Sequence, residues 1–323
     1  MKKSIVSDYV REPELFRKLD TLAHQIFQIS LTDWHRQGLL GANYIPYSCL
    51  MADTLAANVS ANLYSCQIYG QTYKVVQLGT VMTDPAFRGQ GLAAELMKHI
   101  LSIYEKDSLF IFLFANASVL DFYPRFGFER AAQKRTLFDA EDLRKSNNKP
   151  GNFRPVFWEN ETDREVILSA ARERVPNADC FGLTGDVSPR MIYLSDEDFS
   201  GKLFYSEDLH TGACLSIKER VLSVHDIFRS PHMQSVGLRA DMDRILASLP
   251  LLNIDRVECA YTVDATYPNL TEELLDDSDA LFVRASAPLI MPGGRRIMPF
   301  DPVLASRPEI DLSELHFSHL DHT

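Results

Sequence analysis

Helical spacing of apolar residues recurs in the first part of the chain. Between Pro13 and Phe27, apolar residues return every three or four positions, which predicts an amphipathic helix. The same spacing runs through residues 91–104, and a further helical segment begins near Ser118. Residues 109–115 are apolar throughout instead, which is typical of an interior strand covered on both faces of its sheet.

β-forming residues fill most of the chain between these helices. Three runs, at residues 47–51, 54–64 and 73–83, are separated by short turn-forming sequences and therefore predict antiparallel strands. Further strands are expected at residues 4–10 and 134–138. This order of helices and strands predicts an α/β fold, with the α+β character of a mixed sheet.

A polar stretch divides the chain into two halves. Residues 142–160 contain Pro150-Gly151 and neighbouring asparagines, which favours a linker. The second half approximates the element order of the first, with helices at residues 163–174 and 238–249 among short strands at 191–194, 202–205, 213–217, 220–228, 256–261 and 280–284. We expect a first domain at residues 1–141, a linker at 142–160, a second domain at 161–305 and a polar tail at 306–323.

Composition and charge limit the partners of this chain. It has 323 residues, 46% of them apolar, and a formal net charge of −11, which opposes broad attraction to nucleic acid or an anionic membrane and favours a cationic substrate. No apolar run approaches the ~20 residues of a membrane span. No apolar segment follows the two N-terminal lysines, so no secretory signal is expected. The five cysteines are odd in number and scattered, which favours reduced thiols in a cytoplasmic protein.

Three histidines recur every third residue near the C-terminus, at His316, His319 and His322. A metal site also needs neighbouring groups that orient its ligands, and a chain terminus rarely supplies them. We therefore expect no metal.

The segment from Val81 to Ala93 carries the strongest chemical signal. A strand ends here, a loop with Arg88, Gly89 and Gly91 follows, and a helix begins. The first turn of a helix has unsatisfied N–H groups and a partial positive charge, so this junction suits a phosphate. Glycine lets the backbone approach the phosphate oxygens, and Arg88 adds a permanent cation.

Two other phosphate-binding motifs fit this loop less well. Gly89, Gly91 and Ala94 match the loose dinucleotide fingerprint, which needs an early βαβ unit and an acidic residue ~20 residues further on. Strands of hairpin character precede the loop instead, and the next strand ends at Ala115-Asn116 without a carboxylate. A P-loop is excluded because no Gly-Lys-Ser/Thr sequence follows.

A second motif decides between these alternatives. Asn116 follows the buried strand, Tyr123 comes seven residues later, and Gly127-Phe128 closes the segment. Together with Arg88-x-x-Gly91-x-Ala93, this pattern resembles the GNAT superfamily of acetyl-CoA-dependent N-acetyltransferases, over roughly residues 1–140. The resemblance implies a GNAT-like acyl-CoA N-acyltransferase fold with acetyl-CoA as co-substrate.

The resemblance also implies roles for particular residues. The backbone of Val81, Met82 and Thr83 would pair with the pantetheine arm, and an N–H near Thr80 or Val81 would polarise the thioester carbonyl. Tyr123 would be the general acid toward the leaving thiolate, and Asn116 would hydrogen-bond the cofactor near its thiol. The pyrophosphate would lie on the loop amides of Arg88, Gly89, Gln90, Gly91, Leu92 and Ala93.

The acceptor side is less specific. Trp34, His35 and Tyr47 lie in the region that covers the acceptor in this fold, so they are candidates for binding a small-molecule amine or a peptide amine; a core patch under the sheet is an equally good interpretation. The general base has no candidate, because Gln77 and Gly79 stand where some relatives have a glutamate. A non-catalytic acyl-CoA-binding or regulatory module is therefore the alternative function.

The second half lacks both motifs. It resembles the degenerate domain of tandem GNAT proteins of the enhanced-intracellular-survival type. We expect a degenerate GNAT-like domain that does not hold a second cofactor in the same way.

Overall fold

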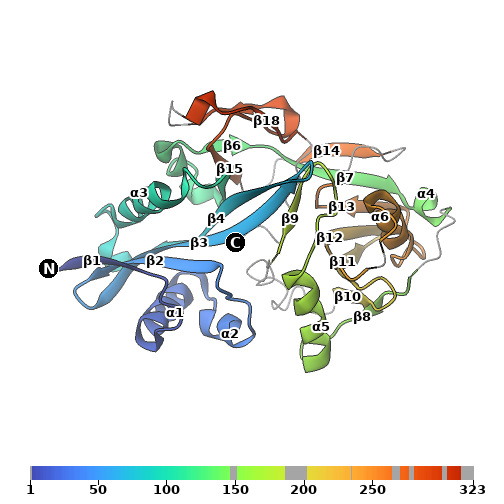
Figure 1. Cartoon of the computed structure of the whole chain (residues 1–323). Helices are drawn as coiled ribbons and strands as arrows, with labels where there is room; N and C mark the ends of the chain where they lie inside the picture. The colour runs from blue at the N-terminus through green and yellow to red at the C-terminus, as the bar shows by residue number, and fades with distance from the viewer. Residues whose placement is uncertain are drawn as a thin grey trace.

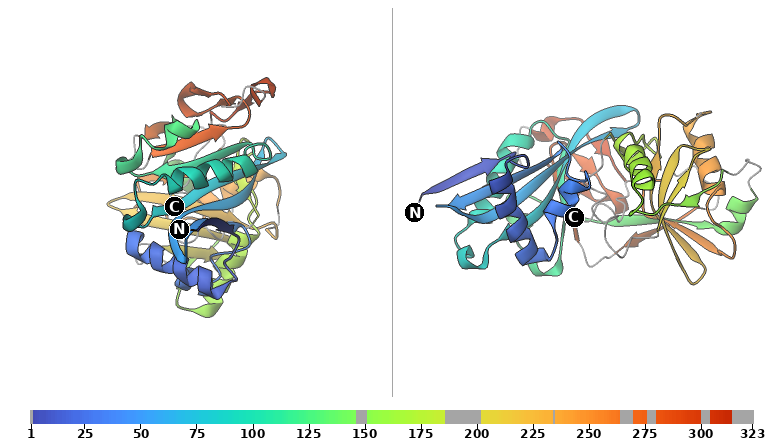
Figure 2. Two further views of the ribbon diagram at one scale, coloured as in Figure 1. Left: turned by 90° about the vertical axis from the view of Figure 1, so that its left-hand side faces the viewer. Right: turned by 90° about the horizontal axis from the view of Figure 1, so that it is seen from below.

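A computed structural model describes residues 2–145, 151–185, 202–233, 235–263, 270–275, 280–299 and 304–313. Within these residues the strands form an eight-stranded sheet, a seven-stranded sheet and a small three-stranded sheet. The two large sheets lie side by side as two lobes (Figures 1 and 2). No helix in the described part of the chain is both long and apolar enough to cross a membrane.

The first large sheet contains five of the six strands predicted in the N-terminal half. Four successive strands pair antiparallel, and the fifth pairs parallel to the fourth. Their type is as predicted, with ends shifted by a few residues. The strands are β1 (Lys3–Ser7), β2 (Tyr44–Met51), β3 (Thr54–Ile68), β4 (Gln71–Thr83) and β5 (Phe110–Ala115).

Helices cover both faces of this sheet. The amphipathic α1 (Pro13–Phe27) buries Leu19 and Ala23 on one face, beside the short α2 (Leu31–Arg36). On the other face, α3 (Leu92–Tyr104) buries Leu96 and Ile100. The helix predicted near Ser118 consists instead of two 3-10 turns, Ala117–Val119 and Tyr123–Phe126.

Strands β4 and β5 separate toward their C-terminal ends. They pair only where Val75–Gln77 lie beside Phe110–Phe112. Residues 78–83 of β4 continue without β5 as a partner. The sheet is therefore open between these two strands.

The second large sheet repeats this topology. Strands β10, β11 and β12 are antiparallel, α6 follows, and β13 runs parallel to β12, as β5 does to β4. The predicted fold, a GNAT-like domain followed by a related second domain, is confirmed at this level. The elements are β8 (Arg154–Pro155), α5 (Glu161–Arg172), β10 (Leu203–Ser206), β11 (Thr211–Lys218), β12 (Val221–Arg229), α6 (Leu238–Ala247) and β13 (Arg256–Cys259). The short strand β9 (Gly182–Thr184) pairs instead with β3 of the first sheet.

The two halves exchange strands. From the second half, β15 (Ala280–Ala285) lies between β5 and β6 (Glu129–Ala131) of the first. From the first half, β7 (Gln133–Asp139) lies between β13 and β14 (Thr271–Leu275) of the second. The predicted boundary at residue 141 therefore does not separate the sheets, because each needs a strand from beyond it.

Other segments also differ from the predicted division. Helix α4 (Ala140–Arg144) occupies the start of the expected linker. In the small sheet, β16 (Leu289–Ile290) pairs with β17 (Arg296–Ile297) and β18 (Ile310–Asp311), so part of the expected tail belongs to a sheet. The strand expected at residues 191–194 and the three C-terminal histidines lie outside the described residues.

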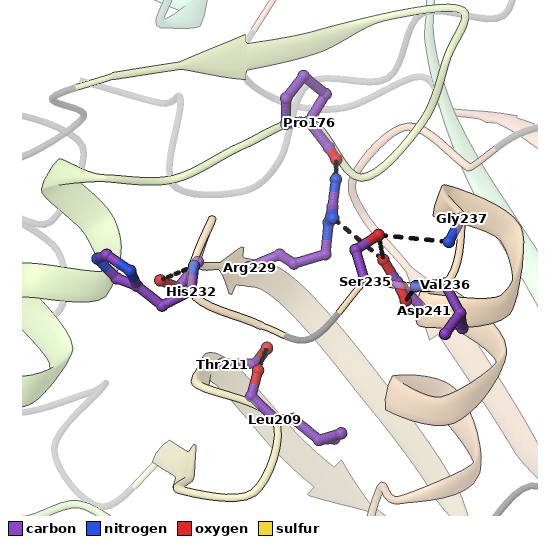
Figure 3. A network of polar contacts seen from close by, with 10 residues as sticks. Pro176, Leu209, Thr211, Arg229, His232, Ser235, Val236, Gly237 and Asp241 are labelled. Carbon is purple, nitrogen blue, oxygen red and sulfur yellow. Dashed lines mark hydrogen bonds and ion pairs between the residues drawn. The ribbon is translucent and has the colours of Figure 1, made fainter.

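Paired buried charges stabilise the second half (Figure 3). The Arg229 guanidinium donates to the Pro176 carbonyl at 2.6 Å and lies 3.5 Å from the fully buried Asp241 carboxylate. The Ser235 hydroxyl also donates to Asp241, at 2.5 Å. These contacts join the end of β12 to α6.

All five cysteines are buried and free, as expected for reduced thiols.

Candidate active site

A cleft of about 1150 Å³ opens where β4 and β5 separate. Residues 78–83 of β4 form one wall, and Phe114, Ala115 and Asn116 at the end of β5 form another. The segment from the end of α1 through α2 closes the third side, and the turn with Tyr123 closes the cleft near β5. The splayed strands thus create a hollow bounded by four separate elements.

The N-terminus of α3 opens onto this cleft through Arg88 and Ala93. Gly89 and Gly91 have φ values of +77° and +76°, and a Cβ would meet no atom within 4 Å at either position. Glycine is therefore favoured here by backbone conformation and not by space. Gly91 is the N-cap of α3 and makes no side-chain hydrogen bond, so no side chain of the cap covers the first-turn amides. This geometry fits the pyrophosphate of a coenzyme.

Tyr123 reaches the cleft from a tightly packed turn. Its side chain is only 4% exposed, and its ring contacts those of Phe122, Phe128 and Phe282. Burial disfavours the charged phenolate and raises the pKa of Tyr123 from 10.0 to about 12. The phenol therefore keeps its proton well into the alkaline range.

The exchanged strand β15 supports this turn. Phe282 lies 5.7 Å from Tyr123 between ring centroids. Two residues along the same strand, the buried Arg284 guanidinium donates to the Phe126 carbonyl and to the Glu105 carboxylate. The second half of the chain thus helps to fix the position of Tyr123.

A β-bulge shapes the β4 wall. The β3–β4 register passes from Asn58 opposite Met82 to Ser60 opposite Gly79, so Thr80 and Val81 together oppose the single residue Val59, and β4 has one extra residue. Thr80 has a φ of +44°, which is uncommon for a β-branched residue. Both residues line the cleft.

The cleft brings together eight of the side chains predicted to form the site: Trp34, Val81, Met82, Thr83, Arg88, Ala93, Asn116 and Tyr123. Gly89, Gln90, Gly91 and Leu92 are in the adjoining loop and first turn of α3. Asn116 is exposed and also caps the following turn, because its Oδ1 accepts from the Ser118 N–H at 3.1 Å.

Two predicted acceptor-side residues do not line the cleft. His35 is exposed, with its ring 5.3 Å from that of Phe16 between centroids. Tyr47 belongs to the core beneath α3, where its hydroxyl lies 2.7 Å from the Tyr104 hydroxyl. It is on the other side of the sheet because successive strand residues face opposite ways.

Sequence analysis missed several polar residues of the cleft. Asp33, Gln37 and Asn62 all line it, and Asp33 is the one carboxylate among its described lining residues. Asn62 is 3% exposed, and within the described structure its Oδ1 accepts no hydrogen bond. The position of Asp33 next to Trp34 was the available signal for an acceptor-side carboxylate.

Two acidic residues near the Arg88–Ala93 loop in sequence bind groups outside the cleft. Asp84 caps the 3-10 turn Pro85–Phe87 by accepting from the Ala86 N–H at 2.8 Å. Glu95 pairs with Lys3 at 2.6 Å. Neither lines the cleft.

The second half also reaches the acceptor wall. The Trp158 indole N–H donates to the Gln37 side-chain carbonyl at 2.8 Å. This bond links the end of α2 to the chain just before α5, and Gln37 itself lines the cleft. The two halves therefore build the site together.

Known proteins with similar sequences and folds are acetyltransferases. Residues 24–131 match the acetyltransferase (GNAT) domain. N-alpha-acetyltransferase 50 from Danio rerio is 27% identical over 150 residues, which cover 43% of this chain and 86% of that protein.

Two solved structures extend the likeness in fold to both halves. A probable N-acyltransferase from Enterococcus faecalis V583 has a TM-score of 0.55 and 15% identity, covering 88% of this chain and 73% of its own. Eis1 from Mycobacterium abscessus has a TM-score of 0.54 and 14% identity, with the same coverage of 88% and 73%. Residues 24–131 are therefore an acetyltransferase (GNAT) domain, and the protein is an acyltransferase enzyme.

Proposed function

We propose that this enzyme transfers the acetyl group of acetyl-CoA to an amine, with Tyr123 as the general acid. The observation that carries this proposal is the convergence of three features on one cleft. These are the α3 N-terminus, the end of β4 that has no β5 partner and the buried, protonated Tyr123.

Each part of acetyl-CoA has a matching surface. The amides of residues 88–93 would bind the pyrophosphate, and the Arg88 side chain, which is exposed, would add a positive charge. The backbone of Val81, Met82 and Thr83 has no β5 partner, so it would pair with the pantetheine amides on that side, with the Arg88 guanidinium giving up its 3.4 Å hydrogen bond to the Thr83 carbonyl. Asn116 lies at the end of β5, where it would contact the thiol end of the cofactor.

The chemistry is direct attack of a neutral amine on the thioester carbonyl. A C–N bond forms as the carbonyl oxygen takes up negative charge, which the Val81 N–H would stabilise. The C–S bond then breaks, and Tyr123 donates its proton to the departing thiolate. The proton lost from nitrogen passes to solvent and Tyr123 regains one.

The acceptor wall favours an amine that carries positive charge when free. The Asp33 carboxylate attracts an ammonium group, and the Trp34 ring offers a surface for it. Asn62 adds a buried acceptor for an N–H group. Since the Danio rerio relative is an N-alpha-acetyltransferase, a peptide amino terminus is the first acceptor to test, and small cationic amines are the second.

The test uses labelled acetyl-CoA with a panel of peptide amines, polyamines and aminoglycosides. Tyr123→Phe should lower kcat by about a hundredfold while the Kd for acetyl-CoA stays within twofold. Tyr47→Phe is the matched control, because it removes a buried hydroxyl on the other face of the sheet.

Two outcomes would contradict the proposal. Full activity of Tyr123→Phe would remove the acid role from Tyr123. Binding of acetyl-CoA without transfer to any amine would favour a non-catalytic acyl-CoA-binding module.

A further inference from the structure

Polar residues replace apolar ones in the core beneath the β4 bulge. On the sheet face covered by α1, β3 presents Asn58, Ser60 and Asn62, with Asn58 and Ser60 completely buried. Buried polar groups are costly unless they are hydrogen-bonded. Their partners therefore show what this cluster does.

Asn58 is at the centre of the cluster. Its Oδ1 accepts from the Ser48 hydroxyl at 2.8 Å, and its Nδ2 donates to the Ser60 hydroxyl at 3.0 Å. The same Nδ2 donates to the backbone carbonyl of Thr80, also at 3.0 Å. Both N–H groups of the Asn58 amide are thus used, and one of them holds the bulge directly.

Further bonds extend the cluster in both directions. The Thr80 hydroxyl donates to the Ser60 hydroxyl at 2.6 Å, and Ser60 donates to the Tyr44 hydroxyl at 2.9 Å. At the remote end, the buried Tyr9 hydroxyl hydrogen-bonds Ser48. We call Tyr9, Tyr44, Ser48, Asn58, Ser60 and Thr80 the Asn58 cluster.

The bond to the Thr80 carbonyl fixes the direction of one amide. The carbonyl and N–H of a planar trans peptide point in opposite directions, and this chain has no cis peptide in its described part. Because the Thr80 carbonyl points at Asn58, the N–H of Val81 points away from it. Val81 lines the cleft.

We propose that Asn58 is a positioning residue, which holds the Thr80–Val81 peptide so that the Val81 N–H faces the thioester carbonyl. Thr80 is in the left-handed region, which a β-branched residue adopts only when its surroundings hold it there. The cluster supplies those surroundings through both the carbonyl and the hydroxyl of Thr80. This inference rests on the proposed function, in which the same N–H stabilises the oxyanion.

The test compares Asn58→Leu with Tyr9→Phe. Both variants remove buried hydrogen bonds from the cluster, but only the first releases the Thr80 carbonyl. We expect Asn58→Leu to lower kcat about ten- to a hundredfold, short of the full loss of an oxyanion donor, with the Kd for acetyl-CoA unchanged. Tyr9→Phe should lower the Tm while kcat stays within about twofold of the wild type.

A second readout does not depend on turnover or on the variants folding. The complex with a ketone analogue of acetyl-CoA, in which CH₂ replaces the sulfur, is followed by NMR. In the wild type, the Val81 amide proton should shift downfield on binding, as expected for a new hydrogen bond to the carbonyl. The Thr80 amide proton should move less.

The outcomes separate the two proposals. If the analogue binds and the Val81 amide does not move, or if the two variants lose kcat equally, the role of Asn58 is wrong while the proposed function stands. If the analogue does not bind at all, the proposed function fails, and the positioning role fails with it.

Discussion

The ring of Tyr123 lies against the ring of Phe282, with 5.7 Å between their centroids and 42° between their planes. Tyr123 belongs to the first half of the chain and Phe282 to the exchanged strand β15. The acid proposed for catalysis is therefore packed by a residue from the half that has no acetyl-CoA motif of its own.

Replacing Phe282 should reduce turnover without unfolding the protein. Phe282→Leu keeps an apolar side chain, so it should cost less than the ~3–5 kcal/mol of a Phe→Ala change. The Tyr123 ring loses a neighbour and its orientation, so we expect kcat to fall several-fold at an unchanged Kd for acetyl-CoA. Phe228→Leu makes the same change in the core of the other sheet and should affect Tm alone. Equal kcat values in the two variants would argue against support of Tyr123 by β15.

The exchange of strands predicts that neither half folds alone. A fragment of residues 1–145 lacks β15, which leaves β5 with an unpaired edge, and its β7 has no sheet to join. It should aggregate or bind hydrophobic dyes, as measured by light scattering and dye fluorescence. Co-expression with residues 146–323 should restore a soluble complex. A soluble fragment that unfolds cooperatively would show that the exchange is dispensable.

Alkaline pH should destabilise the wild type more than Tyr123→Phe. The unfolded phenol loses its proton above pH 10, while the folded one has a pKa of about 12. The contribution of Tyr123 is therefore constant below pH 10 and falls as pH rises to 12. At pH 11 the difference in unfolding free energy between the two proteins should have changed by about 1.4 kcal/mol relative to pH 8. Urea unfolding at the two pH values measures it, and a constant difference would mean that Tyr123 is not shielded from solvent.

Gly91, at the start of α3, should contribute to acetyl-CoA affinity as well as to stability. Gly91→Ala forces a Cβ into a left-handed residue, as Gly70→Ala does in the β3–β4 turn, where φ is +79°. Both should lower the free energy of unfolding to a similar extent, by about 1–2 kcal/mol, and so lower the Tm. Only Gly91→Ala should weaken acetyl-CoA binding, by about tenfold, in calorimetric titrations. Similar affinities in the two variants would place the pyrophosphate elsewhere.

Asp33 should influence the acceptor and not the cofactor. Its side chain is 53% exposed and pairs with Arg36, so its attraction for an ammonium group is partly screened. Asp33→Asn should raise the KM of a cationic acceptor by about two- to fivefold, with the difference shrinking at high salt. Asp53→Asn, in the β2–β3 turn, removes a charge that does not line the cleft and should leave KM unchanged. An unchanged KM for Asp33→Asn would exclude this carboxylate from acceptor binding.

Two local signals in the sequence led to much of the site. The Arg88–Ala93 loop and the Tyr123–Phe128 segment each depend on turns and helix ends that a few neighbouring residues specify. Both therefore lie on the cleft as predicted. Tyr47 packs in the core on the opposite face of the sheet, as the alternative interpretation of it had allowed, because successive residues of a strand face opposite ways and the sequence does not say which face borders the cleft.

The polar residues of β3 suggest an exposed face in the sequence but are buried in the structure. Asn58, Ser60 and Asn62 alternate with apolar residues, which by itself predicts a strand with one face in water. That face is covered by α1, so these residues form a buried cluster and part of the cleft instead. Only the tertiary contacts reveal their partners.

By itself, the sequence determined the type and order of most helices and strands, and it pointed to the glycine loop before α3 and to Tyr123 of the same cleft, because periodicity, turns and helix ends are local properties. The tertiary structure alone decided which sheet each strand joins. Strands β7 and β15 have the same β-forming character whichever sheet receives them, so their exchange depends on the neighbours that each meets in space. The same holds for Asp33, Asn58 and Phe282, whose roles come from residues far away along the chain.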